Sequence, residues 1–302
     1  MEASAFAPAH ITGLVLPDER SSDPLHAGSK GIGFSIQEGV TTKVKAEQGT
    51  SGEEVEVWIN GNPAPDAKVS REAAKIILRR AGGKKCNLTI DHLVQVPIGV
   101  GFGTSGAAAL SLTLAVNKAL ELGLSTVEAA QTAHVAEVIC RTGLGTVLAE
   151  LHGGFEVRVS PGAPGFGKLI QIPLNKEYSV VALTFGALST GDMLDALEQS
   201  REAYSLAENL LVSFMQDRSV ENFLQVSNKF SRFLALNSRL QRVLTEADDA
   251  GFTCGVALFG ETVFTLVKPE ETELVERTFK RLATNGSKVL TTRISDQGAR
   301  VL

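Results

Sequence analysis

The chain has 302 residues, of which 43% are hydrophobic and 21% are charged, a composition typical of globular proteins and not of disordered ones. Its 29 basic and 34 acidic residues give a formal charge of -5, which leaves no excess of positive charge to hold a nucleic-acid backbone. The cysteines at positions 86, 140 and 254 are too widely spaced to specify a disulfide framework or a zinc site.

The sequence gives no sign of a targeting or membrane segment. Residues 1–8 carry no basic stretch, and no run reaches the roughly 18 apolar residues that a membrane span needs. The cysteine pattern favours a reducing compartment. We therefore expect a cytoplasmic protein that binds neither a membrane nor a nucleic acid.

The first quarter of the chain predicts strands separated by loops. A short strand is expected over residues 3–7, followed by a loop that begins at Pro8. A second loop, rich in Ser, Gly and Pro, is expected over residues 21–33. Alternating apolar residues then predict strands over 34–44 and 55–59, which we expect to pair antiparallel.

The next segments predict a helix, a strand and a buried helix. The first helix begins near Ser70 and is stopped by the glycines at 82–83, and a strand follows over 87–96. After a glycine-rich interruption, residues 107–122 are apolar nearly all round. This pattern predicts a helix that is buried on every side.

A further helix and strand complete the first half. The helix begins at Ser125, where Glu128 provides the acid of a capping box, and it extends to Cys140. Strict alternation over 155–160 predicts a strand, and the glycines and prolines of 161–167 predict an irregular surface segment.

From Tyr178 onwards the pattern predicts a second domain of α+β class. We place the domain boundary between residues 174 and 175, with a nucleotide-binding domain over 1–174, a C-terminal domain over 175–302 and the functional site between them. The expected elements are a strand over 178–185, helices across 190–249, a strand pair over 255–267 that turns at Gly260-Glu261, a helix from Glu270 and a strand over 288–294.

The most informative segment is the glycine-rich stretch from Pro97 to Ala108. Glycines allow the backbone to approach an anion closely, and the start of the following helix supplies free N–H groups and a positive dipole. Thr104 and Ser105 add hydroxyl groups suited to phosphate or Mg²⁺. The alternative is a glycine-rich turn that packs closely against a neighbouring helix.

Two well-known nucleotide motifs are excluded. Gly101-x-Gly103-x-x-Gly106 matches the dinucleotide fingerprint, and Glu121 has the spacing of its ribose-binding acid. In that fold, however, the acid ends a second parallel strand, whereas here the segment is helical. No lysine follows the glycines, so the P-loop pattern is absent as well.

At this segment the chain resembles the GHMP kinases, the superfamily of galactokinase, homoserine kinase and mevalonate kinase. Their phosphate loop reads P-x-x-x-G-[LF]-G-[ST]-S-[AG]-A, and residues 97–107 fit every fixed position. The superfamily's other two motifs are matched by residues 7–11, Ala-Pro-Ala-His-Ile, and by the glycine-containing hairpin at 255–264. The resemblance covers the whole chain and implies the two-domain GHMP architecture, with helices over the N-terminal sheet and a ferredoxin-like α+β C-terminal domain.

Within the superfamily, four further segments resemble those of the archaeal pantoate kinases. The resemblance implies ATP- and Mg²⁺-dependent phosphorylation of (R)-pantoate to (R)-4-phosphopantoate in coenzyme A biosynthesis, by an enzyme that could be a homodimer. The alternatives are a GHMP kinase for another hydroxylated metabolite, such as homoserine or shikimate, and a catalytically silent paralogue that only binds nucleotide. The segments are Pro8–Gly13, Asp23–Gly31, Thr142–Gly145 and Gly153–Arg158.

The resemblance also assigns the ATP and metal sites. Ser105 and Glu137 are implied as Mg²⁺ ligands, and their oxygen atoms suit that ion. The alternative for Glu137 is a helical ion pair with Arg141. The implied ATP-binding residues are Pro97, Gly99, Gly101, Gly103, Thr104, Ser105, Gly106 and Ala107.

The acceptor is expected to contact a separate group of residues. Arg158, which shares a strand face with Glu156, is predicted to bind the pantoate carboxylate through its planar guanidinium. The alternative is a cross-strand ion pair on a wet surface. His134 lies one turn before Glu137 on the same helix face and is predicted to contact the acceptor and take part in catalysis. Further acceptor contacts are predicted for Ser29, Lys30, His10 and Thr146.

Thr146 departs from the superfamily pattern, because many members carry an aspartate there as a base or an acceptor-orienting group. A threonine cannot act as a general base at neutral pH. Either transfer here depends on positioning and charge neutralisation alone, or another group such as His134 or Glu150 assists.

Overall fold

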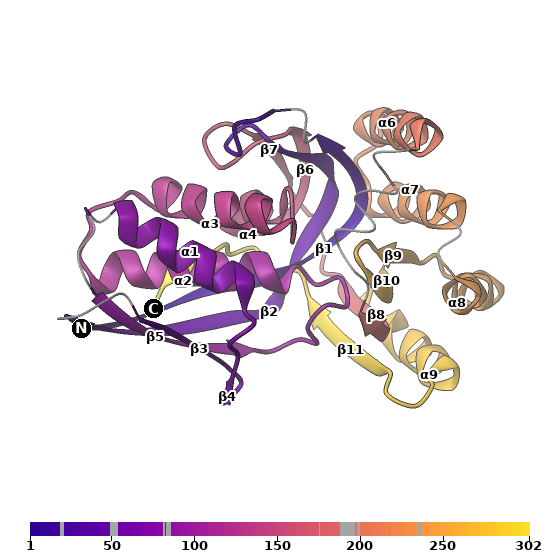
Figure 1. Cartoon of the computed structure of the whole chain (residues 1–302). Helices are drawn as coiled ribbons and strands as arrows, with labels where there is room; N and C mark the ends of the chain where they lie inside the picture. The colour runs from indigo at the N-terminus through magenta and orange to yellow at the C-terminus, as the bar shows by residue number, and fades with distance from the viewer. Residues whose placement is uncertain are drawn as a thin grey trace.

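The computed structural model describes residues 1–18, 21–48, 54–80, 82, 86–174, 176–187, 197, 200–234 and 237–302. Two β-sheets lie side by side, each covered by helices, which confirms the α+β class (Figure 1). The larger sheet has the order β12-β1-β2-β5-β3-β4, with β6 and β7 added beside β2. Its strands are β1 (Glu2–Asp18), β2 (Gly28–Gln48), β3 (Val55–Ile59), β4 (Asn62–Pro63), β5 (Cys86–Val94), β6 (Phe155–Ser160), β7 (Lys168–Ile172) and β12 (Arg300–Val301).

Strand β1 is continuous through the segment where the sequence predicted a loop. It pairs antiparallel with β2 along its whole length, and the register shifts between Pro8 and His10 and again between Thr12 and Leu14. Such bulges absorb a residue that cannot pair regularly and re-aim the side chains beside them. The loop prediction at Pro8 was therefore wrong, because β-bulges accommodate the proline and the glycine within one strand.

The pairing predicted between residues 34–44 and 55–59 was also wrong. Strand β2 pairs antiparallel with β1, β5 and β6, whereas β3 pairs parallel with β5. A parallel pair needs a crossover connection, and helix α1 (Lys68–Arg80) supplies it between β3 and β5. Strand β2 also begins earlier than predicted, at Gly28.

Four helices cover one face of the larger sheet (Figure 1): α1, α2 (Thr104–Ala119), α3 (Thr126–Cys140) and α4 (Thr146–His152). Helix α2 is buried along most of its length, as predicted, and Ser125 forms the predicted capping box with Glu128. Helix α4 and strand β7 are short and were not predicted. Residues 161–167 were predicted to lie on the surface, but Gly162 and Ala163 are buried.

The smaller sheet is fully antiparallel with the order β11-β8-β10-β9, the strand order of a ferredoxin-like domain. The hairpin turns at Leu258-Phe259, two residues before the predicted position. Its strands are β8 (Ser179–Ala187), β9 (Gly255–Ala257), β10 (Gly260–Val267) and β11 (Lys288–Arg293). The accompanying helices are α6 (Arg201–Gln216), α7 (Val220–Phe233), α8 (Ser238–Asp249) and α9 (Thr272–Leu282), with a 3-10 turn, η1 (Pro269–Glu271), before α9.

One face of the smaller sheet packs into the same apolar core as the larger sheet, and a second apolar cluster lies on its other face. A cluster of phenylalanine rings joins elements of both halves, with centroid distances of 5.2 to 6.4 Å. Beyond β11 the chain returns to the larger sheet, where Ile294 bridges to Ile36 and β12 pairs with β1. The boundary proposed at residue 174 lies between β7 and β8. No helix in the described residues is long and apolar enough to cross a membrane.

Candidate functional site

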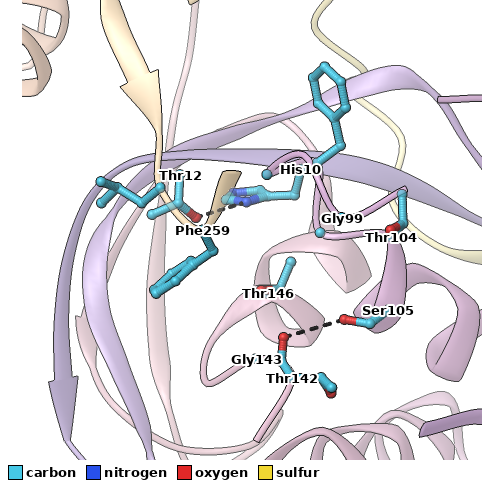
Figure 2. Close-up of a pocket in the computed structure, with 13 residues that line it drawn as sticks. His10, Thr12, Gly99, Thr104, Ser105, Thr142, Gly143, Thr146 and Phe259 are labelled. Atoms are coloured by element: carbon cyan, nitrogen blue, oxygen red, sulfur yellow. Dashed lines mark hydrogen bonds between the residues drawn. The ribbon is translucent and has the colours of Figure 1, made fainter. Parts of the chain in front are cut away.

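A pocket lies where the two sheets meet, and Figure 2 shows the side chains around it. Its wall comes from β1, the glycine-rich loop with the start of α2, the segment before α4, and the β9–β10 turn. Each of the three motifs singled out in the sequence contributes to it. The lining residues are His10, Thr12, Gly99, Gly101, Phe102, Gly103, Thr104, Ser105, Thr142, Gly143, Thr146, Leu258 and Phe259.

The glycine-rich loop leads directly into α2. Gly99, Gly101 and Gly103 have φ values of 78, 100 and 62°, a region that favours glycine over residues with a Cβ atom. Gly103 is the N-cap of α2, and no side chain caps the first turn, which also contains no acidic residue. The free N–H groups and the helix dipole at this end therefore remain available to an anion.

The β9–β10 hairpin holds the glycine-rich loop in place. The Thr262 hydroxyl donates a hydrogen bond of 2.6 Å to the Val100 carbonyl, and the Leu258 N–H donates one of 3.0 Å to the Thr12 carbonyl. Gly260 packs so closely that a Cβ atom there would lie 1.8 Å from the carbonyl carbon of Val100. Gly260 is therefore needed for the close contact with Val100 and not for the turn. The residue of the turn with a positive φ, 71°, is Phe259.

Glu137 lies behind the pocket wall, against Thr142 and Gly143. Its side chain is 2% exposed, and the Thr142 hydroxyl donates to Oε1 at 2.7 Å. The Ser105 hydroxyl donates to the Thr142 carbonyl at 3.4 Å (Figure 2). Burial raises the pKa of Glu137, an effect that the hydrogen bonds partly offset. Its burial does not fit the solvated helix face that the alternative pairing with Arg141 assumed.

Glu150 is a second buried carboxylate beside the loop. It is on α4, one helical turn after Thr146, and neither Oε1 nor Oε2 has a hydrogen-bond partner within the described part of the chain. Burial, followed by the nearby charge of Glu137, raises its pKa well above the usual value, while Arg158 has the opposite effect. The sequence analysis named Glu150 only as a substitute for the absent aspartate.

A row of buried, hydrogen-bonded side chains includes His10 and continues behind it. Oε1 of Glu156 accepts from Arg158 Nη1 at 2.6 Å and lies 3.2 Å from His10 Nε2, while Thr12 Oγ1 lies 3.2 Å from His10 Nδ1. Burial lowers the pKa of His10, and the negative charge of Glu156 partly opposes this. The predicted strand face shared by Glu156 and Arg158 is present, but it is inside the protein and not on a wet surface.

The structure places Arg158, Ser29 and Lys30 outside the pocket wall. Arg158 is 1% exposed and separated from the pocket by His10, and its Nε atom has no partner in the described structure. A Cβ atom on Gly145 would lie 2.4 Å from the Ser29 hydroxyl and 3.1 Å from Arg158 Nε, so these two groups approach the same point. Lys30 is partly exposed on β2.

His134 has a different position from the one predicted for a catalytic group. Its Nε2 atom lies 3.1 Å from the Pro24 carbonyl and 3.0 Å from the Ala27 carbonyl, the geometry of an N–H donor that anchors this segment. Burial lowers its pKa. Because His134 does not line the pocket, its geometry favours a structural role over the acceptor contact and catalysis that the sequence predicted.

The chain matches a family model and resembles curated proteins over most of its length. Residues 68–154 match the GHMP kinases N-terminal domain. The chain is 31% identical over 280 residues to the pantoate kinase of Thermococcus kodakarensis, with 89% of each chain covered. It is 30% identical to the pantoate kinase of Methanocaldococcus jannaschii, over 89% of this chain and 94% of that one.

Solved structures are also similar to this chain over its whole length. A phosphotransferase related to the coenzyme A biosynthesis pathway superposes with a TM-score of 0.87 at 28% identity, over 100% of this chain and 98% of that one. A homoserine kinase from Cytophaga hutchinsonii superposes with a TM-score of 0.74 at 18% identity, over 100% and 97% of the two chains, a likeness of fold alone.

Proposed function

The chain belongs to the pantoate kinases of the GHMP kinase superfamily, and we propose that it transfers the γ-phosphoryl group of ATP to the primary 4-hydroxyl of (R)-pantoate. The product would be (R)-4-phosphopantoate, for coenzyme A biosynthesis. The observation that carries this proposal is the convergence of the three sequence motifs on one pocket. A cytoplasmic location, an archaeal source and a homodimer remain parts of the proposal.

The glycine-rich loop is proposed to hold the triphosphate of ATP. The uncapped start of α2 and the glycines with positive φ support this role, because they offer backbone N–H groups without steric hindrance. The backbone of residues 97–107 would bind the phosphate oxygens, with the hydroxyls of Thr104 and Ser105 beside them. The contact with the β9–β10 hairpin fixes the loop before ATP binds, which lowers the entropic cost of binding.

The oxygen atoms of Ser105, Glu137 and Glu150 are suited to binding Mg²⁺. Ser105 and Glu137 offer hydroxyl and carboxylate oxygens, which this ion prefers, and Glu150 next to them has two buried oxygens without partners. When bound, the ion would supply positive charge that neutralises the charge developing during transfer. Ser105 and Glu137 would hold it beside the start of α2.

The acceptor is proposed to bind at the His10 side of the pocket. His10 and Thr146 line this side, and His10 is oriented by Glu156 and Thr12. Arg158, behind His10, is proposed to bind the pantoate carboxylate through its free Nε atom, which approaches the same point beside Gly145 as the Ser29 hydroxyl. Phosphoryl transfer through a loose transition state requires chiefly alignment of the acceptor hydroxyl, so the absence of a carboxylate at Thr146 does not prevent it.

The substrate is tested by measuring ADP release with pantoate, homoserine, shikimate, mevalonate and phosphomevalonate. We expect strong turnover with pantoate alone. Homoserine is the most demanding competitor, because Glu150 is an unpartnered carboxylate that could attract its ammonium group. Preferred turnover of homoserine would contradict the assignment, and ATP binding without ADP release above background for any acceptor would indicate a silent paralogue.

An Arg158→Lys variant tests how the acceptor is recognised. Lysine keeps the positive charge but loses the planar guanidinium, so KM for pantoate is expected to rise at least about tenfold, a loss of about 1.4 kcal/mol, with KM for ATP little changed. Steady-state kinetics with each substrate varied separately give both constants. If Arg158 serves only its ion pair with Glu156, the change would lower Tm and leave the pantoate KM as it was.

A further inference from the structure

Among the described residues, the buried acidic and basic side chains lie at this site, and the acidic ones outnumber the basic ones. Three carboxylates, Glu137, Glu150 and Glu156, are at most 2% exposed, and Arg158 is the one arginine or lysine buried to the same degree in the described chain. Arg158 pairs with Glu156. Removing an ionised group from water is unfavourable unless an opposite charge or hydrogen bonds compensate it. Each of the remaining two carboxylates must therefore be protonated or be balanced by a positive charge.

Glu150 is the less satisfied of these two. The Thr142 hydroxyl donates to Glu137, whereas both oxygens of Glu150 lack a partner. Buried polar atoms in proteins are nearly always hydrogen-bonded, and an exception requires an explanation, such as a catalytic role, an ordered water molecule or a bound ion. The guanidinium of Arg158 does not complete it, because no hydrogen bond to Glu150 is formed.

The two carboxylates approach each other at the start of α2. A Cβ atom on Gly106 would lie 2.8 Å from Glu150 Oε2 and 3.1 Å from Glu137 Oε2, and one on Gly103 would lie 2.8 Å from Glu150 Oε1. Glu137 comes from α3 and Glu150 from α4, so two helices bring carboxylate oxygens close to the same point beside the residue that follows Ser105. Any side chain at Gly106 would occupy this space.

We propose that Glu150 is a second carboxylate ligand for the divalent cation, beside Glu137 and Ser105. The proposal rests on the proposed kinase function, since the cation is the one that accompanies ATP. Two carboxylates and a hydroxyl are oxygen ligands of the type that Mg²⁺ and Mn²⁺ bind, and phosphate and water oxygens would complete the shell. A cation of charge +2 also balances the two carboxylates that Arg158 leaves uncompensated.

The test measures binding of Mn²⁺ alone to the full chain, from the electron paramagnetic resonance signal of the free ion. Glu150→Gln keeps the shape of the side chain and removes its charge, so we expect the Kd for Mn²⁺ to rise at least about tenfold. The same loss is expected when a non-hydrolysable ATP analogue is present. An unchanged Kd in both titrations would overturn the proposal.

Two control variants separate ligation from a general loss of negative charge. Glu156→Gln removes a carboxylate from the same buried cluster, but one that is paired with Arg158, so it is expected to lower Tm with little effect on Mn²⁺ affinity. Glu208→Gln removes an exposed carboxylate on α6 and is expected to change neither property. Equal weakening of Mn²⁺ binding by Glu150→Gln and Glu156→Gln would contradict direct ligation.

Thermal unfolding gives a second, independent readout. Without a divalent cation, Glu150→Gln is expected to raise Tm or leave it unchanged, because it removes a buried and uncompensated group. Mg²⁺ is expected to raise the Tm of the wild-type chain more than that of the variant. A lower Tm in the variant, with an undiminished response to Mg²⁺, would show that Glu150 has a structural role. Because no acceptor is present, failure of the pantoate assignment would leave these results unaffected.

Discussion

A Glu137→Gln variant is expected to remain folded and to lose at least about a hundredfold in kcat for ADP release. Glutamine keeps the Oε1 atom that accepts the hydrogen bond from Thr142, so the change removes the charge and little else. Since burial already disfavours the charged form of Glu137, Tm is expected to stay the same or rise slightly. Steady-state kinetics at saturating ATP and pantoate, together with thermal unfolding, measure both effects.

Glu208→Gln, on the exposed face of α6, is the matched control and is expected to show wild-type kinetics. Retained activity in Glu137→Gln would mean that the residue serves only as the acceptor of the Thr142 hydroxyl. A large fall in Tm would likewise contradict a role in metal binding, because it would show that the charge stabilises the fold.

Gly260→Ala is expected to disturb stability and ATP binding together. The added methyl group would meet the carbonyl carbon of Val100 at 1.8 Å, and backbone atoms cannot rotate away as a side chain can. Overpacking of this kind costs about 1–3 kcal/mol, and here the displaced backbone is that of the glycine-rich loop. We therefore expect a lower Tm and a KM for ATP that rises about tenfold or more.

Gly186→Ala is the control for this substitution, since Gly186 pairs with Glu261 next to Gly260 in the same sheet. Its Cβ atom would meet only the flexible end of the Glu261 side chain, at 3.3 Å. Near wild-type stability and KM are expected. If Gly260→Ala lowered Tm without changing KM for ATP, the hairpin would stabilise the fold without positioning the loop.

The elements that the sequence predicted well are those specified by neighbouring residues. The capping box at Ser125 and the apolar character of α2 are local patterns, and both are confirmed. Pairing between distant strands has no comparable local signal. The parallel register of β3 with β5 depends on the path of α1, and the continuity of β1 depends on bulges opposite β2, so neither could be deduced from alternation alone.

The same distinction applies to the site. The spacing on one helix placed His134 and Glu137 on a common face, but it could not indicate that residues 24–27 would cover His134 with two carbonyl groups. The strand face shared by Glu156 and Arg158 was visible in the alternating pattern, whereas their pairing and their burial behind His10 required the fold. Thr12 was detectable in principle, because it lies two residues after His10.

The return of the chain to the larger sheet connects residues 299–301 to the acceptor side of the pocket. The Ala299 N–H donates to the Glu150 carbonyl, and Arg300 and Val301 pair with Phe6 and Ala5 of β1. Residues 300–301 therefore cover one edge of β1, while β2 covers the other. Residue 299 adds support to the helix that carries Thr146 and Glu150, so local unfolding of this segment would loosen the acceptor side of the pocket.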